Sequence, residues 1–91
     1  MTQVIITMKI MPSSPEVNLQ DLADTSSKII EKHEGFPGKI DFIPIAFGLQ
    51  SVNIIFTRDE TKGSMDDMEE ELADLENVNS VNIIDVRRAV G

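Results

Sequence analysis

Apolar and polar residues follow two different periods along this chain, and the periods predict its secondary structure. Over residues 4–11 the side chains alternate and many are β-branched, which favours a strand that is apolar on most of both sides and therefore central in a sheet. Helical spacing then follows over residues 19–33, with Asn18 as its N-cap. A second helix is predicted after Ser64, which would cap it, from apolar residues at intervals of three and four: Met65, Met68, Leu72 and Leu75.

Three further strands complete the predicted set of elements. They cover residues 39–47, 49–57 and 80–88, while residues 35–38 and 58–63 are expected to form loops. The resulting order, β-α-β-β-α-β, is typical of the α+β ferredoxin-like sandwich: a four-stranded antiparallel sheet in the order 4-1-3-2 with two helices on one face.

The segment at residues 42–49 carries the most specific local signal. Proline cannot donate a hydrogen bond to a neighbouring strand, so Pro44 places the second strand at an edge of the sheet. Gly48 permits a tight turn or bulge directly after Phe47. A large ring at such a corner either closes the end of the core or is offered to a partner, and Phe47 and Gly48 are therefore candidate contact residues.

A second candidate pair, Arg87 and Arg88, ends the last strand. We expect the second and fourth strands to run in the same direction, which would bring Phe47 and the two arginines to one end of the sheet. Three inter-strand spacings would then separate the ring from the cations by roughly 10–15 Å. Two arginines at the end of a chain can equally serve solubility. Their expected location at the same end as Phe47 is therefore what suggests a functional site.

Length and composition bound the remaining possibilities. The 91 residues fit one domain, predicted to span residues 1–91, and 41% apolar residues suffice for a core. Cysteine is absent, which excludes disulfides, thiolate metal sites and cysteine nucleophiles. Neither a signal peptide nor an apolar run of membrane-spanning length is evident, so we expect a soluble, cytoplasmic protein that is monomeric when free.

The charge balance disfavours two classes of partner. A formal net charge of −8 opposes binding to phosphate backbones and to anionic membranes, so we expect neither direct nucleic-acid binding nor membrane association. A basic protein partner is compatible with this charge, and so is a simple contribution to solubility.

No residue pattern indicates an enzyme, a cofactor or a metal. His33 is the single histidine and is expected to interact with the last carbonyls of its helix. A run of carboxylates near the start of the second helix lacks a calcium-loop pattern and is expected to be a solvated face: Asp66, Asp67, Glu69, Glu70 and Glu71.

The fold leaves three other function classes open. The main alternative is a ferredoxin-like regulatory or dimerising module that binds a small ligand. An RNA-binding module would need exposed aromatics in basic surroundings, and the acidic charge disfavours it. An acylphosphatase-like enzyme would need an arginine near the first strand, whereas Arg58 is the first arginine in the chain.

Several segments together resemble translation elongation factor 1-beta, in its archaeal form without an N-terminal extension. The likeness covers the whole chain, and its most specific piece is Pro-Ile-Ala-Phe-Gly-Leu at residues 44–49. The other segments that carry it are Glu34-Gly35, Val78-Asn79-Ser80-Val81-Asn82-Ile83 and Arg87-Arg88.

This resemblance implies a guanine nucleotide exchange factor for elongation factor 1-alpha, the GTPase that delivers aminoacyl-tRNA. It implies that Phe47 inserts into the GTPase, as the phenylalanine of the family's Phe-Gly motif does, beside a cation near the C-terminus. The family has a lysine where this chain has Arg88, which replaces a compact charge with a planar, forked one.

Overall fold

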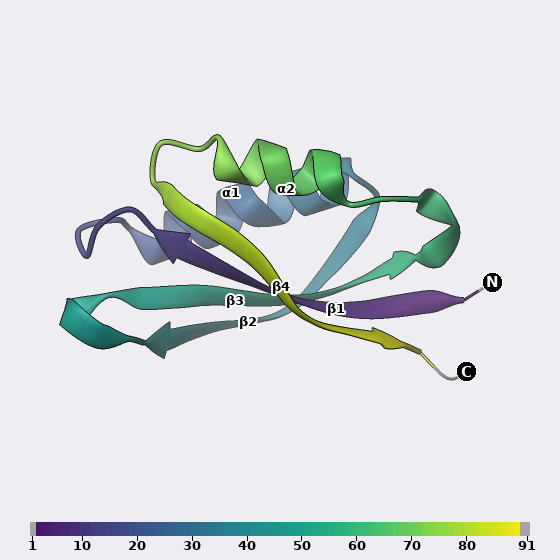
Figure 1. The fold of residues 1–91 in the computed structure, drawn as a ribbon, viewed down its shortest axis with the longest axis horizontal. Helices are drawn as coiled ribbons and strands as arrows, with labels where there is room; N and C mark the ends of the chain where they lie inside the picture. The colour runs from purple at the N-terminus through teal and green to yellow at the C-terminus, as the bar shows by residue number, and fades with distance from the viewer. Residues whose placement is uncertain (1, 90–91) are drawn as a thin grey trace.

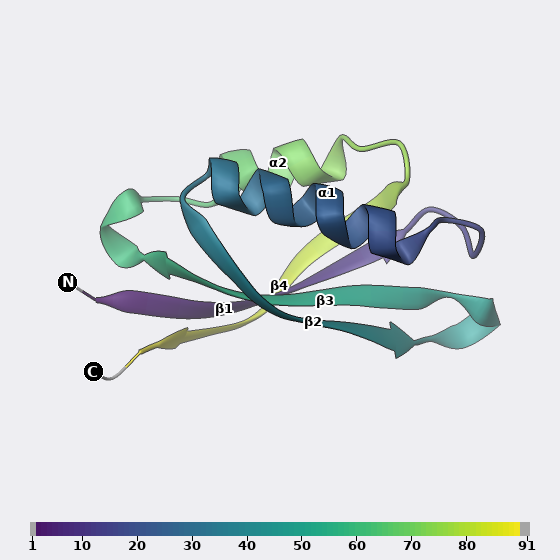
Figure 2. The same ribbon diagram turned by 180° about the vertical axis from the view of Figure 1, so that it is seen from behind.

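The alternating segment at the start of the chain forms the central strand of an antiparallel sheet in the computed structural model, which describes residues 2–89 (Figure 1). Two helices lie side by side on one face of this sheet (Figures 1 and 2). In chain order the elements are β1 (Gln3–Pro12), α1 (Leu19–Lys32), β2 (Gly35–Pro44), the short turn η1 (Ala46–Gly48), β3 (Gln50–Asp59), the short turn η2 (Glu60–Lys62), α2 (Asp66–Ala73) and β4 (Val78–Arg88).

The sheet order confirms the predicted fold. The strands follow one another as β2-β3-β1-β4, with every neighbouring pair antiparallel. This is the ferredoxin-like arrangement, with β2 and β4 at the edges and β3 and β1 as the two inner strands. Pro44 ends the edge strand, where its missing N–H leaves no partner unsatisfied.

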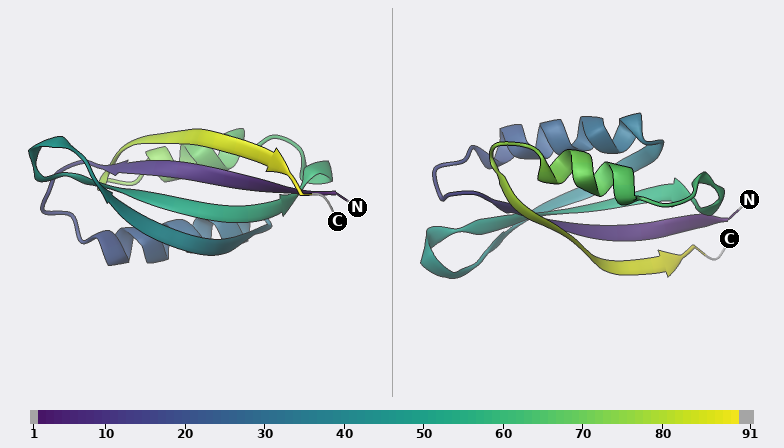
Figure 3. Two further views of the ribbon diagram at one scale, coloured as in Figure 1. Left: turned by 90° about the horizontal axis from the view of Figure 1, so that it is seen from below. Right: turned by 45° about the horizontal axis from the view of Figure 1, so that its top comes forward.

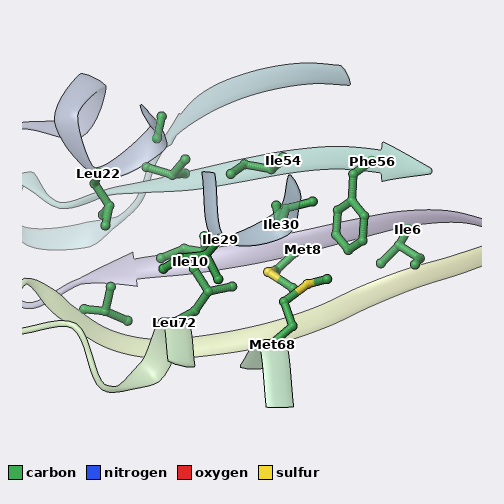
Figure 4. Packing of buried hydrophobic residues seen from close by; sticks show 13 residues of the cluster. Ile6, Met8, Ile10, Leu22, Ile29, Ile30, Ile54, Phe56, Met68 and Leu72 are labelled. Atoms are coloured by element: carbon green, nitrogen blue, oxygen red, sulfur yellow. The ribbon is translucent and has the colours of Figure 1, made fainter. Parts of the chain in front are cut away.

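The core lies between the sheet and the helices. One side of each central strand is buried, and the buried residues alternate along β1 and β3 (Figure 4). The predicted helical spacing is also confirmed, because Met68 and Leu72 are buried while Met65 and Leu75 pack against the cluster. The largest buried side chains include Phe56, Ile6, Met8, Ile10, Leu22, Ile30, Ile54, Met68 and Leu72.

The predicted loop at residues 35–38 is wrong, because these residues begin β2. Glu34 takes a positive φ of 69° directly after α1 and reverses the chain, a position where glycine is more usual. Gly35 serves close packing instead: a Cβ there would lie 2.6 Å from Cγ2 of Ile30. A glycine in this sequence thus marks contact between α1 and β2, not a flexible connection.

The predicted loop at residues 58–63 is also partly wrong, since β3 continues through Asp59 before η2 begins. The predicted cap of the second helix is present, because the Ser64 hydroxyl accepts a hydrogen bond from the Asp66 N–H at 3.1 Å. α2 starts at Asp66.

The expectation that Phe47 and the two arginines share one end of the sheet is wrong. Three antiparallel pairings separate β2 from β4, and an odd number of reversals makes these strands run in opposite directions. In register, Gly35 pairs with Arg58, Arg58 with Val4, and Val4 with Arg88. Phe47 follows the other end of β2, so roughly 25–30 Å of strand separates it from the arginines. Figure 2 shows the β2–β3 turn and the end of β4 at opposite ends of the molecule.

Candidate functional site

The turn between β2 and β3 is a two-residue reversal formed by Phe47 and Gly48. Phe47 has φ 61° and ψ 32°, and Gly48 has φ 76°. Positive φ at both central residues is the pattern of a type I′ turn, which matches the twist of the flanking strands. The Leu49 N–H closes the turn by donating to the Ala46 carbonyl at 3.2 Å, and the Ile45 N–H donates to the Leu49 carbonyl at 2.7 Å.

Phe47 occupies a backbone conformation that bulky residues avoid. Asparagine, aspartate and glycine usually fill this position, and a left-handed residue of another type costs about 1 kcal/mol or more. The Phe47 ring gains little in return, because the residue is 94% exposed. The alternative in which Phe47 closes the end of the core is therefore wrong. A strained backbone that presents an uncovered aromatic ring is typical of a contact site.

The end of β2 and the residue after it add further exposed apolar side chains next to this turn. Phe42, Ile43 and Ile45 all precede the ring and are all exposed. We call Phe42, Ile43, Ile45 and Phe47 the apolar tip. A Cβ on Gly48 would meet nothing within 4 Å, so glycine is needed there for its φ and not for space.

Arg87 and Arg88 lie at the other end of the sheet with exposed side chains. Nε of Arg87 is 2.9 Å from Oδ2 of Asp85, and Nη2 of Arg88 is 3.1 Å from Oε2 of Glu60. Exposed ion pairs of this kind contribute at most about 1 kcal/mol, so either arginine can exchange its carboxylate for another. The backbone is held more firmly, since the Ala89 N–H donates to the Gln3 carbonyl at 2.8 Å.

Arg58 is a structural residue that the sequence interpretation missed. It is only 7% exposed, and its guanidinium donates to three backbone carbonyls: His33 at 3.0 Å, Gly63 at 2.8 Å and Lys62 at 3.3 Å. The guanidinium thereby ties the end of α1 to the connection before α2. One signal was available, because Arg58 continues the inward alternation of Ile54 and Phe56.

Asp59 stabilises the turn that follows Arg58. Its Oδ1 accepts hydrogen bonds from the Thr61 hydroxyl at 2.7 Å and from the Thr61 N–H at 2.9 Å. These hydrogen bonds, the side-chain one first, lower the pKa of the Asp59 carboxyl below 3.8. Together with Arg58, Arg87 and Arg88, Asp59 defines what we call the arginine end.

His33 takes a different partner from the expected helix carbonyls. Its Nε2 lies 3.0 Å from Oε1 of Glu71, and Lys32 Nζ lies 2.9 Å from the other oxygen of the same carboxylate. Hydrogen bonds with His33 and Lys32 lower the pKa of Glu71. The group links α1 to α2 beside the arginine end, since the His33 carbonyl also accepts a hydrogen bond from Arg58 Nε at 3.0 Å. Among residues 2–89, no group of three or more His, Cys, Asp or Glu side chains is placed to hold a metal ion.

Comparison with known proteins identifies a family. Residues 5–89 match the family described as the EF-1 guanine nucleotide exchange domain. Archaeal proteins named Elongation factor 1-beta are similar over nearly their whole length. The protein from Methanococcus maripaludis strain C6 is 36% identical over 86 residues, covering 94% of this chain and 97% of the relative. The one from Methanobrevibacter smithii is 41% identical over 88 residues, covering 97% and 98%.

Solved structures agree on the fold at much lower identity. The C-terminal domain of the MgtC protein from Mycobacterium tuberculosis superposes with a TM-score of 0.64 at 11% identity, covering 97% of this chain and 88% of that one. The ACT domain from the GTP pyrophosphokinase of Chlorobium tepidum gives 0.59 at 16% identity, covering 90% and 99%. At such identities the likeness concerns the fold alone. No helix within residues 2–89 is long and apolar enough to cross a membrane.

Proposed function

The chain belongs to the EF-1 guanine nucleotide exchange domain family, and we propose that it accelerates GDP release and GTP reloading on elongation factor 1-alpha, the GTPase of translation elongation. The match over residues 5–89 carries this proposal, because it covers all four strands and both helices. Relatives of nearly the same length carry the name Elongation factor 1-beta, which supports residues 1–91 acting as a single exchange domain.

The apolar tip is the first contact in this proposal. Phe47 inserts its ring into an apolar depression of the GTPase, and Gly48 allows the turn that holds the ring outward. The left-handed backbone of Phe47 supports this role, since the turn has already been formed before the partner arrives. Binding then fixes few additional rotatable bonds, so a preorganised anchor of this kind loses little conformational entropy.

The arginine end is the second contact. Arg87 or Arg88 approaches the nucleotide site, where a guanidinium can take over carboxylate contacts and disfavour the bound Mg²⁺. Glu60 must release Arg88 for this purpose, at the small cost of an exposed ion pair. Because roughly 25–30 Å separates the arginines from Phe47, the two contacts fall on different parts of the GTPase. A single wedge that carries both groups is geometrically excluded.

Exchange by this route involves no covalent step and no cofactor. By thermodynamic linkage, the exchange factor lowers the affinity of the GTPase for GDP by the same factor by which GDP lowers its affinity for the exchange factor. The proposal places the free protein in the cytoplasm as a monomer, with the GTPase as partner and without direct contact to nucleic acid or membrane.

Release of a fluorescent GDP analogue tests the proposal. The cognate elongation factor 1-alpha is loaded with the analogue and mixed with excess unlabelled GDP, with and without this protein. We expect the release rate to rise with the concentration of the protein and to saturate. A release rate that stays at its intrinsic value over the whole concentration range would contradict the proposed function.

A further inference from the structure

One face of the sheet is left uncovered by the helices, and it carries an exposed aromatic residue at the arginine end. Figure 3 shows this face from below, with the strands in front of the helices. Phe36 pairs with Thr57, which alternates with the buried Phe56 and Arg58, so Phe36 points away from the core. It is 66% exposed. At this end of the molecule Phe36, and not Phe47, accompanies the arginines.

The backbone around Phe36 is restrained on both sides. Gly35 packs so closely against Ile30 and Phe56 that a Cβ would not fit without movement. Pro37 follows, and a residue before proline is confined to extended conformations. The Phe36 ring is therefore presented from a rigid segment, which limits the entropy lost when a partner covers it.

The neighbours of Phe36 on this face form a continuous row. Register places Thr57 beside Phe36, Ile5 beside Thr57, and Arg87 beside Ile5. Three inter-strand spacings put Phe36 and Arg87 roughly 14 Å apart. Ile55 lies two residues from Thr57 on the same face, diagonal to the Phe36 ring. The row thus combines apolar side chains, a hydroxyl and one exposed guanidinium.

The distribution of charge favours the strand layer over the helical layer as the part of the molecule that approaches bound nucleotide. The four strands, both faces counted, hold five basic and three acidic residues, a net charge of +2, and one of the basic residues, Arg58, is buried toward the helices. The rest of the chain holds three basic and thirteen acidic residues, a net charge of −10. A GTPase carries the phosphates of its nucleotide at the site where exchange occurs. The acidic helical layer is repelled from such a site more than the strand layer is.

We propose that the uncovered sheet face around Phe36 is a third contact with the GTPase, in which Phe36 packs on an apolar segment of elongation factor 1-alpha beside its nucleotide site while Arg87 pairs with a neighbouring carboxylate. This inference rests on the proposed function and adds to it a residue outside the Phe-Gly turn and the C-terminal cations. The contact orients the arginine end so that a guanidinium reaches the nucleotide.

A pair of substitutions at the same end tests the contact. Phe36→Ala removes the ring from the uncovered face. Val86→Ala is the matched control, because Val86 is 55% exposed at the same end but pairs with the core residue Ile6 and so points to the helical side. We expect Phe36→Ala to weaken binding to nucleotide-free elongation factor 1-alpha roughly tenfold and to slow stimulated GDP release. Val86→Ala is expected to change both the affinity and the release rate less than about twofold. Thermal unfolding of both variants is expected to match that of the wild type.

The possible results separate the two proposals. If the wild type fails to stimulate GDP release, the proposed function fails and this inference fails with it. If the wild type is active and Phe36→Ala behaves like Val86→Ala, the inference alone is wrong. A concentration-dependent dimer in sedimentation that Phe36→Ala abolishes, without an effect on the GTPase, would assign the face to a second copy of this chain and overturn the inference.

Discussion

The two ends of the sheet present their exposed groups in opposite ways. At the apolar tip, two backbone hydrogen bonds and a pair of left-handed residues hold Phe47, and the ring itself is almost wholly exposed. At the arginine end, side chains hold the backbone: Arg58 binds the end of α1 and Gly63 after η2, and Asp59 binds Thr61 within η2. The tip therefore presents an exposed ring that the fold does not use for packing, whereas the arginine end combines a stabilising network with exchangeable surface ion pairs.

The largest effect is expected at Arg58, which should distinguish the two ends by stability. Arg58→Met keeps much of the side-chain volume but leaves three backbone carbonyls, those of His33, Lys62 and Gly63, without this donor. We expect the free energy of unfolding to fall by about 3 kcal/mol, which lowers Tm by roughly 10–20 °C. Urea denaturation followed by circular dichroism measures the change.

The exposed Arg87 at the same end is the control. Arg87→Met should change the unfolding free energy by less than about 0.5 kcal/mol. Equal denaturation midpoints for Arg58→Met and the wild type would show that the three hydrogen bonds do not stabilise this end.

At the tip, substitution of Phe47 should affect exchange without loss of stability. Phe47→Ala is expected to slow stimulated GDP release about tenfold and to leave the unfolding free energy within about 0.5 kcal/mol. Phe47→Asn should be equally slow but more stable than Phe47→Ala by about 0.5–1 kcal/mol, since asparagine tolerates the left-handed conformation. A Tm of Phe47→Ala far below that of the wild type would instead make the ring part of the core.

A smaller effect is expected from the ion pair between Arg88 and Glu60. Arg88→Ala should slow stimulated GDP release severalfold, whereas Glu60→Gln frees the guanidinium and should leave the rate equal or higher. Both variants are expected to unfold within about 0.5 kcal/mol of the wild type, because the pair is exposed. Stopped-flow release assays at low salt compare them, and equal rates for the two variants would remove Arg88 from the mechanism.

The smallest expected effect is a local change around Asp59 at low pH. The folded pKa of Asp59 lies below its unfolded value of 3.8, so its stabilising contribution is complete above that value and is lost as the pH falls through the folded pKa. Below about pH 4 the Thr61 amide resonance should therefore shift in NMR spectra, while that of Leu49 at the tip should not. Asp59→Asn should abolish the shift of Thr61. Parallel movement of the Thr61 and Leu49 resonances would point to a global transition instead.

Local patterns predicted much of this molecule correctly because they reflect local physics. Alternation in β1 and β3, helical spacing around Met68 and the edge position of Pro44 were all confirmed. The wrong loop at residues 35–38 has an identifiable cause: glycine was interpreted as a turn signal, whereas Gly35 packs so closely against Ile30 of α1 and Phe56 of β3 that no room is left for a Cβ. Arg58 was misplaced because its acceptors are brought to it by the folded chain: His33 is distant in the sequence, and Lys62 and Gly63 lie at the end of the turn that follows β3.

The sequence by itself determined the order of the elements, the helical and alternating apolar positions and the reversal at Phe47 and Gly48, because neighbouring residues decide those features. Only the tertiary structure decided which groups lie at the same end of the molecule. Each antiparallel pairing reverses the chain, and the register shifts between Pro37 and Ile40 and between Thr7 and Met8 decide which residue lies opposite which. Hydrogen bonding between distant strands therefore placed Phe36 beside the arginines and Phe47 at the far end.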